Sequence, residues 1–237
     1  IVGLGSNKAD VNGGVNHFGS PFNFPEEFVT VYRLHSMVPD LIEFRELRND
    51  PNSIRQKIPV VETLRGKAIQ AVRRYGLADW AVSMGRQRLG KLTLRNHPLF
   101  LQGLNLPRLH SLTGQIDVPA LDIIRDRERG VPRYNEFRRQ YGLRQLTSFD
   151  DFIDPNLSKN SSERARQQQI VGLLREVYGQ HKCDDSKIIT TAQLDADDAR
   201  INDCLGHTDG SMVDNIEDVD AVVGWLAEFV RPHGFAI

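Results

Sequence analysis

Apolar residues near the start of the chain recur at the spacing of a helix. Phe28, Val31, Leu34 and Val38 fall on one side of such a helix. Pro25 suits its first position, and the acidic pair that follows complements the positive end of the helix dipole. A proline at position 39 disfavours helical geometry just before it. The pattern therefore predicts a helix over residues 25–37, after which Asp40 can cap a short helix at 41–48.

The same periodicity continues along most of the chain. Glycines that are typical helix stop signals follow four of the periodic segments, at Gly76, Gly90, Gly142 and Gly179. Alternating strand patterns are almost absent, and there is no internal repeat. The sequence thus predicts an all-α fold with long loops and little or no sheet. Its further helices are expected at 60–75, 77–89, 117–129, 134–141, 162–178 and 217–230.

A polar, Asp-rich segment interrupts this pattern at 182–213, inside a weakly periodic stretch of 180–215. Polar composition supplies little apolar area to offset the entropy of ordering, so we expect a loosely packed surface insertion that can be deleted without loss of the core. Cys183 and Cys204 lie in this segment and are the only cysteines of the chain. Their pairing is left open, and a reducing compartment is the default expectation.

Length and composition place the chain among globular proteins. It has 237 residues, of which 26% are charged, and a formal net charge of −1. That balance argues against a dedicated nucleic-acid binder, which would want a basic excess. Arginines and aromatics alternate at 134–144, as in some RNA-binding surfaces, but no recognition motif follows them.

The ends of the chain suggest a part of something larger. There is no initiator Met and no signal peptide, and no run of 18 apolar residues occurs. We therefore expect residues 1–237 to be part of one domain of a longer protein. A soluble cytoplasmic or peripherally membrane-associated protein is expected rather than an exported one.

The histidines give one candidate site. None of the seven has the spacing of a zinc motif. His35 differs because it stands in an apolar helical pattern three residues after Tyr32, and residues at i and i+3 share a helix face. From the residues alone, this is either a packing pair or a haem ligand beside a redox-active tyrosine.

Three segments together resemble a known family. EEFVTVYRLHSMVPD (26–40) carries Tyr-x-x-His, and DVPALDIIRDRERGVPRYNEFRRQYGL (117–143) carries R-x-R-x-x-G-x-P-x-Y-N-x-x-R followed by Gly-Leu. LLREVYG (173–179) and DVDAVVGWLAE (218–228) complete the order. These segments are similar to the haem-dependent peroxidase–cyclooxygenase superfamily, which includes the animal haem peroxidases. Within this superfamily, the residues of these segments favour the fatty-acid α-dioxygenase branch.

The resemblance implies a cofactor and site residues. The histidine of Tyr-x-x-His is the family's proximal iron ligand, so haem b is expected on His35. In the dioxygenase branches the tyrosine becomes a radical that takes hydrogen from a fatty acid, so Tyr32 is the implied catalytic residue. Mammalian peroxidases place an asparagine against the proximal histidine, and Asp122 stands at that position here. A carboxylate there makes the imidazole more basic. Arg33 is the candidate partner of a haem propionate.

One family element has no counterpart in this sequence. The distal histidine that cleaves peroxide lies upstream of Tyr-x-x-His in the family, and we expect the remainder of the parent chain to supply it. The expected function is a fatty-acid dioxygenase using peroxide and dioxygen. The alternatives are a haem peroxidase that oxidises a small-molecule reductant, and a non-catalytic haem-binding or scaffold module.

Overall fold

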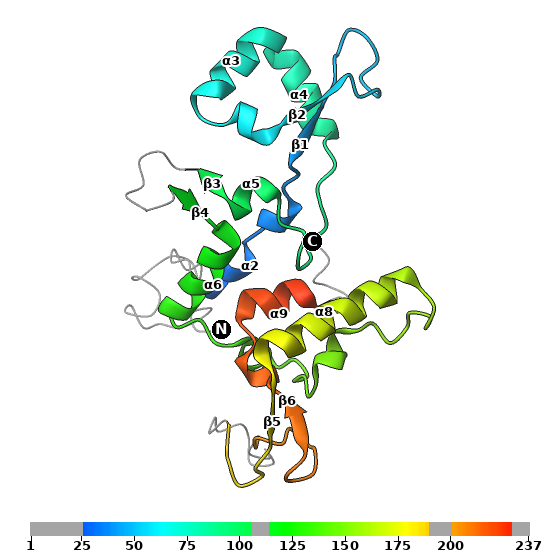
Figure 1. The fold of residues 1–237 in the computed structure, drawn as a ribbon. Coiled ribbons are helices and arrows are strands. Elements are labelled where there is room, and N and C mark those ends of the chain that lie inside the picture. Colours follow the sequence, from blue (N-terminus) through cyan, green and yellow to red (C-terminus); the bar gives the residue numbers. More distant parts are fainter. Residues whose placement is uncertain (1–25, 106–113, 190–200, 229–237) are drawn as a thin grey trace, which may run out of the picture. The chain divides into compact units, whose positions relative to one another are not determined.

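The computed structural model describes residues 26–105, 114–189 and 201–228. These residues fall into two units, one of residues 32–124 and one that joins the residues up to Val31 to those from Arg125 onward. The described residues are mostly helical, which confirms the predicted class, and their strands form three two-stranded antiparallel sheets (Figure 1). Within the described ranges, no helix is long and apolar enough to cross a membrane.

The 32–124 unit is built from short elements. They are η1 (His35–Met37), β1 (Leu41–Phe44), β2 (Gln56–Pro59), η2 (Val60–Thr63), α3 (Gly66–Tyr75), α4 (Leu77–Arg86), α5 (Leu99–Gln102), β3 (Leu104–Asn105), β4 (Gln115–Ile116) and the first part of α6 (Val118–Glu128). Helices α4 and α6 confirm the helices predicted at 77–89 and 117–129, although α4 ends at Arg86, before its predicted end.

The helix predicted at 41–48 is wrong. Residues 41–44 form strand β1, which pairs with β2 so that Ile42 faces Ile58. Pairing with a partner strand overrides the local pattern, as is common for short apolar runs. Asp40 does cap a helix, but a distant one, because its carboxylate accepts hydrogen bonds from the backbone N–H groups of Leu99 and Phe100 in α5.

An aromatic cluster forms the core beside β1. The ring of Phe44 lies 4.5 Å from that of Tyr75 and 5.1 Å from that of Trp80, measured between centroids. Gly76 makes the tight turn between α3 and α4 at a φ of 86°, which favours glycine. The helix predicted over 60–75 is broken before Gly66, where Arg65 has a φ of 56°, so α3 begins later than its sequence pattern indicates.

The second unit contains the longest helix. Its elements are α2 (Glu26–Val31), the end of α6, α7 (Tyr134–Gln140), η3 (Phe149–Phe152), α8 (Ser162–Tyr178), β5 (Gln180–Lys182), β6 (Met212–Asp214), η4 (Ile216–Asp218) and α9 (Ala221–Ala227). Helix α8 has the predicted bounds because Ser161 caps its first turn and Gly179, at a φ of 75°, ends it. Helix α7 packs against α9, and α8 packs against η3.

Two further predicted helices are shorter than expected. The helix expected over 25–37 ends at Val31, and the chain turns before η1. Val29, Thr30 and Val31 are β-branched residues with weak helix propensity, and the Thr30 hydroxyl bonds to Asp126 as well as to its own helix. The helix expected over 217–230 is divided into η4 and α9, and its last two residues lie outside the described part.

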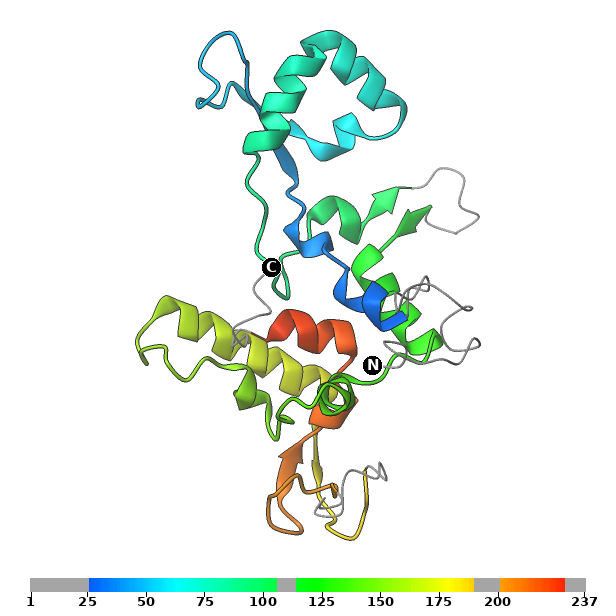
Figure 2. The same ribbon diagram turned by 180° about the vertical axis from the view of Figure 1, so that it is seen from behind.

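A disulfide and a pair of strands hold the two ends of the segment at 182–213 together. Cys183 and Cys204 form a disulfide, and both are buried with Val213. Strands β5 and β6 pair from Gln180↔Asp214 to Lys182↔Met212. The two strands lie side by side in Figure 1 and, seen from behind, in Figure 2. Loose packing is therefore wrong for the described flanks of this segment. That it can be deleted, and that the compartment is reducing, stay predictions.

Candidate functional site

Three charged or titratable side chains meet at the start of η1. His35 Nδ1 lies 2.7 Å from Asp122 Oδ2, and Asp122 comes from α6, 87 residues later in the chain. The other carboxylate oxygen, Oδ1, accepts a hydrogen bond from Nη1 of Arg33. Arg33, Asp122 and His35 are called the His35 cluster below. The carboxylate of Asp122 thus lies between the guanidinium of Arg33 and the imidazole of His35.

The members of the His35 cluster differ in exposure. The side chains of Arg33 and Asp122 are 10% and 9% exposed, whereas that of His35 is 38% exposed. The ion pair is shielded from water, so it is screened less than a surface pair. The imidazole ring remains open to a further partner.

This arrangement fits a haem ligand. A metal-binding histidine characteristically donates its second ring N–H to a carboxylate or carbonyl, which fixes its tautomer and orientation. Asp122 occupies Nδ1 of His35, which leaves Nε2 for a metal. The donor set therefore fits a histidine that would hold the iron of haem through Nε2.

The side chain of Arg33 contacts Asp122 and does not lie on the surface. Because its guanidinium already pairs with a carboxylate, the structure gives Arg33 a partner within the chain. Its assignment to a haem propionate stays a prediction.

The backbone around His35 is held by a distant segment. Asn96 donates from Nδ2 to the carbonyl of Ser36 at 2.9 Å, and the N–H of Gly90 donates to the carbonyl of Met37 at 2.8 Å. A Cβ atom at position 90 would lie 3.0 Å from the Ser36 oxygen. Gly90 therefore allows a close approach of two chain segments, whereas the sequence indicated a helix stop.

His97 is an electrostatic neighbour that the sequence did not single out. Burial lowers its pKa; the negative charge of Asp122 raises the pKa of His97, while His35 lowers it. No sequence pattern connects His97 with His35, since 62 positions separate them. Only the fold brings Asn96, His97 and the His35 cluster into one neighbourhood.

Tyr32 does not share a helix with His35. The helix α2 ends at Val31, so the i,i+3 argument for a common helix face is wrong. Tyr32 is 67% exposed. That exposure excludes a buried packing pair with His35 and leaves the Tyr32 side chain accessible.

The arginine-rich signature serves the packing of α7 against α9. Arg127 and Arg133 both pair with the buried carboxylate of Asp220, and Arg138 pairs with Glu228 at 2.7 Å. Asp220 is the third residue and Glu228 the last residue of the segment DVDAVVGWLAE (218–228) quoted above. The two motifs are therefore mutual partners within the fold.

Polar contacts inside the same unit complete this packing. Asn135 holds both backbone groups of Leu146, accepting from its N–H at 2.8 Å and donating to its carbonyl at 3.0 Å. Arg139 pairs with Glu136 and Glu217. Because Arg138 and Arg139 are buried in such pairs, they do not form the basic surface that RNA binding requires.

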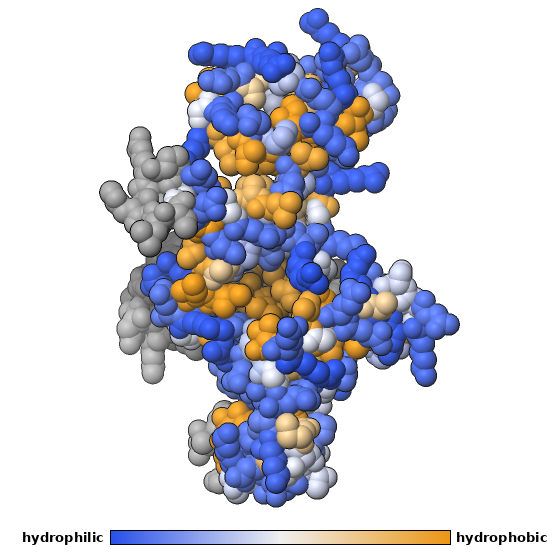
Figure 3. Space-filling view, in the orientation of Figure 1, coloured by the Kyte–Doolittle hydropathy of each residue, from blue (hydrophilic) through white to orange (hydrophobic). Residues whose placement is uncertain are grey.

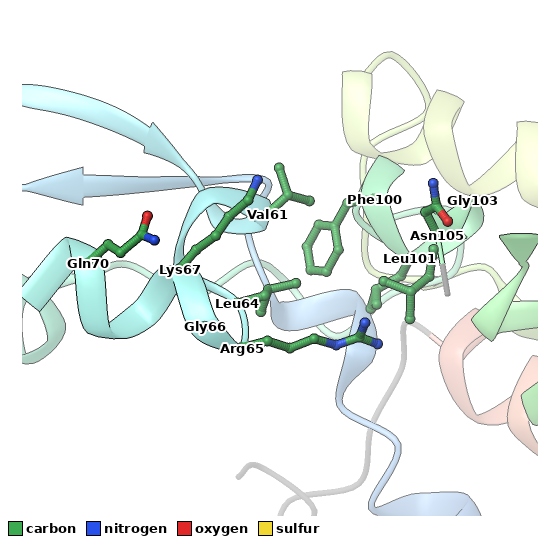
Figure 4. Close-up of a pocket in the computed structure, with 11 residues that line it drawn as sticks. Val61, Leu64, Arg65, Gly66, Lys67, Gln70, Phe100, Leu101, Gly103 and Asn105 are labelled. Carbon is green, nitrogen blue, oxygen red and sulfur yellow. The ribbon is translucent and has the colours of Figure 1, made fainter. Parts of the chain in front are cut away.

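A cavity of about 1030 Å³ lies elsewhere in the 32–124 unit. Figure 4 shows the ring of Phe100 between Val61 and Leu64 on one side and Leu101 on the other. None of the residues that line it belongs to the His35 cluster, so the two features are separate. Figure 3 shows apolar surface over the part of the molecule that holds α3 and α4. Apolar residues of these helices are exposed, among them Ile69, Leu77 and Met84.

The helical fold agrees with a comparison against known families. Residues 14–186 match the model described as "Animal haem peroxidase", which is most of the chain. The chain belongs to this family, which implies a haem cofactor.

Particular relatives within that family are α-dioxygenases. The chain is 35% identical over 230 residues to alpha-dioxygenase 1 of Capsicum annuum, and 33% identical over 229 residues to alpha-dioxygenase PIOX of Nicotiana tabacum. These alignments cover 94% and 93% of this chain but 28% of each relative. The chain thus spans little more than a quarter of the relatives it matches.

Solved structures give the same picture. Fatty acid α-dioxygenase from Oryza sativa is 30% identical, with a TM-score of 0.62 over 91% of this chain and 29% of that one. A tyrosine-to-phenylalanine variant of the rice enzyme, crystallised with palmitic acid, has a TM-score of 0.61 at 29% identity, over 90% of this chain and 28% of that one.

Proposed function

We propose that this protein is a haem-dependent fatty-acid dioxygenase, in which His35 ligates the iron of haem b and Tyr32 is the catalytic radical. The observation that carries the proposal is the hydrogen bond between His35 and Asp122, at 2.7 Å. His35 lies three residues after Tyr32, whose side chain is exposed. Family membership and the α-dioxygenase relatives support this proposal. The name of one rice structure, which includes palmitic acid, supports a fatty acid as the substrate.

The residues of this chain have distinct roles in the proposed reaction. His35 binds through Nε2, and Asp122 holds Nδ1–H so that the ring keeps one tautomer and one orientation. Bound haem supplies the oxidising power that no amino-acid side chain has. Tyr32 gives up a hydrogen atom from its phenol to the oxidant that bound haem would supply. The phenoxyl then takes a hydrogen atom from the acyl chain, and dioxygen adds to the carbon radical. The peroxyl radical takes a hydrogen atom back from Tyr32, which leaves a fatty-acid hydroperoxide and restores the phenoxyl.

Replacing Tyr32 with Phe tests this function. Phenylalanine keeps the ring but cannot form a phenoxyl radical, and Tyr32 is too exposed for the lost hydroxyl to disturb a core. We expect Tyr32→Phe to lose fatty-acid oxygenation by orders of magnitude while haem content and peroxide reactivity are kept. Each factor of ten corresponds to about 1.4 kcal/mol of barrier. Oxygen consumption with a long-chain fatty acid measures the effect in the full-length protein.

Tyr141→Phe is the matched control, because Tyr141 is also exposed and lies outside the His35 cluster. It should consume oxygen at the wild-type rate. Equal rates for Tyr32→Phe and wild type would remove Tyr32 from the mechanism. Peroxidase turnover without oxygen uptake by the wild type would favour the peroxidase alternative, and absence of haem uptake would favour a scaffold.

A further inference from the structure

The two carboxylate oxygens of Asp122 accept hydrogen bonds from two different side chains. Oδ2 accepts from His35, and Oδ1 accepts from Arg33. A carboxylate bonded to an imidazole alone pulls the Nδ1 proton toward itself, and the ring then donates more electron density to a metal on Nε2. A guanidinium on the other oxygen withdraws part of that negative charge.

We propose that Arg33 is a positioning residue that weakens the pull of Asp122 on His35 and thereby keeps the bound haem iron at a higher reduction potential. This inference rests on the proposed function, in which His35 is the axial ligand. The carboxylate of Asp122 pulls on the Nδ1 proton of His35 more strongly than an asparagine would, and Arg33 weakens this pull. A higher potential suits a site that must oxidise a tyrosine.

Burial makes this contribution larger than that of a surface arginine. The side chains of Arg33 and Asp122 are about nine-tenths buried, so little water screens the charge between them. Arg33 lies two residues before His35 in the chain. Arg33 and the proposed haem ligand His35 therefore lie on the same short segment of the chain.

Two substitutions distinguish an electronic effect of Arg33 on the haem iron from a role in which Arg33 only holds Asp122 in place. Arg33→Met removes the cation, and Asp122→Asn removes the carboxylate charge. In the full-length, haem-loaded protein, we expect Arg33→Met to lower the Fe(III)/Fe(II) potential and to raise the iron–histidine stretching frequency of the ferrous state in resonance Raman spectra. We expect Asp122→Asn to shift both quantities in the opposite direction.

The opposite signs make the test decisive. If Arg33 only held Asp122 in place, its loss would loosen the Asp122–His35 bond, and Arg33→Met would shift both readouts in the same direction as Asp122→Asn. That result, or no shift, overturns the inference. Arg33→Lys keeps the charge but loses the planar guanidinium, so both readouts should lie between those of wild type and Arg33→Met. It serves as the deciding variant if Arg33→Met does not fold, because its shift must have the same sign.

Arg45→Met is the matched control. Arg45 is equally buried, at 10% side-chain exposure, and pairs with Glu43 in the same unit. Its loss removes a buried arginine–carboxylate pair without touching Asp122, and both readouts should stay at their wild-type values. A wild-type iron–histidine band that persists in His35→Ala would instead overturn the proposed ligand and, with it, this inference.

Discussion

Single glycines allow the close contacts on which this structure depends. At Gly224, a Cβ atom would lie 2.1 Å from the Tyr134 ring, which is far inside van der Waals contact. Tyr134 is buried and stacks on Phe152 with the ring centroids 6.0 Å apart. Glycine at 224 therefore lets α9 approach α7 across the face of this ring.

Gly224→Ala should destabilise the protein by about 1–3 kcal/mol or more, because the Tyr134 ring has to move from a packed core. Gly172→Ala is the control, since Gly172 lies within α8 with no atom within 4 Å of its built Cβ. Alanine there should stabilise the protein by up to about 1 kcal/mol. Denaturant unfolding measures both changes, and a neutral Gly224→Ala would contradict the packing described here.

At the scale of elements, two buried carboxylates connect segments that no local pattern joins. Asp220 precedes α9 and accepts from Arg127, Arg133 and Tyr178. Asp214 ends β6 and accepts a hydrogen bond from the backbone N–H of Phe149, the first residue of η3, at 2.7 Å. Burial alone would favour the neutral acids. These hydrogen bonds and charges outweigh burial and lower the pKa of both carboxyls.

Lowered pKa values predict a loss of stability in acid. A carboxyl whose pKa is lower in the folded state stabilises the fold above its unfolded value, about 3.8 for Asp, and this contribution disappears as pH falls through the folded value. The free energy of unfolding should therefore decrease below about pH 4.

Asp220→Asn should cost about 1–3 kcal/mol at neutral pH and show a shallower decrease in acid than wild type. The exposed neighbour Asp218 provides the control Asp218→Asn, which should keep the wild-type slope. Urea unfolding at several pH values measures these differences. An unchanged slope in Asp220→Asn would mean that its carboxylate does not carry the linkage.

At the scale of the whole molecule, the sequence predicted the helical class and the helices that carry their own start and stop signals. Helix α8 has both Ser161 and Gly179, and its predicted bounds are those of the structure. Strand β1 was missed because its conformation depends on pairing with β2, twelve or more residues away. Segment 25–37 was overextended because Thr30 makes a side-chain contact with Asp126 that no local pattern records.

The candidate site was predictable only in part. The motif around His35 and the position of Asp122 could be quoted from the sequence, and the structure brings these two residues together. The pairing of Arg33 with Asp122 could not be foreseen, nor could the hydrogen bond from Asn96 to Ser36, because each joins residues at least 60 positions apart. Such contacts follow from tertiary packing alone.

The central claim is that His35 holds the haem, and haem content tests it most directly. We compare the full-length wild type with His35→Ala by absorbance of the Soret band per protein chain. The control is His181→Ala, because Nε2 of His181 also lies close to a carboxylate, 3.0 Å from that of Asp203, but His181 is in the other unit.

We expect His35→Ala to lose the haem or to shift its Soret band, and added imidazole to restore the wild-type position by entering the vacated space. His181→Ala should keep normal haem content. A His35→Ala protein with wild-type haem content and an unshifted Soret band would contradict the account.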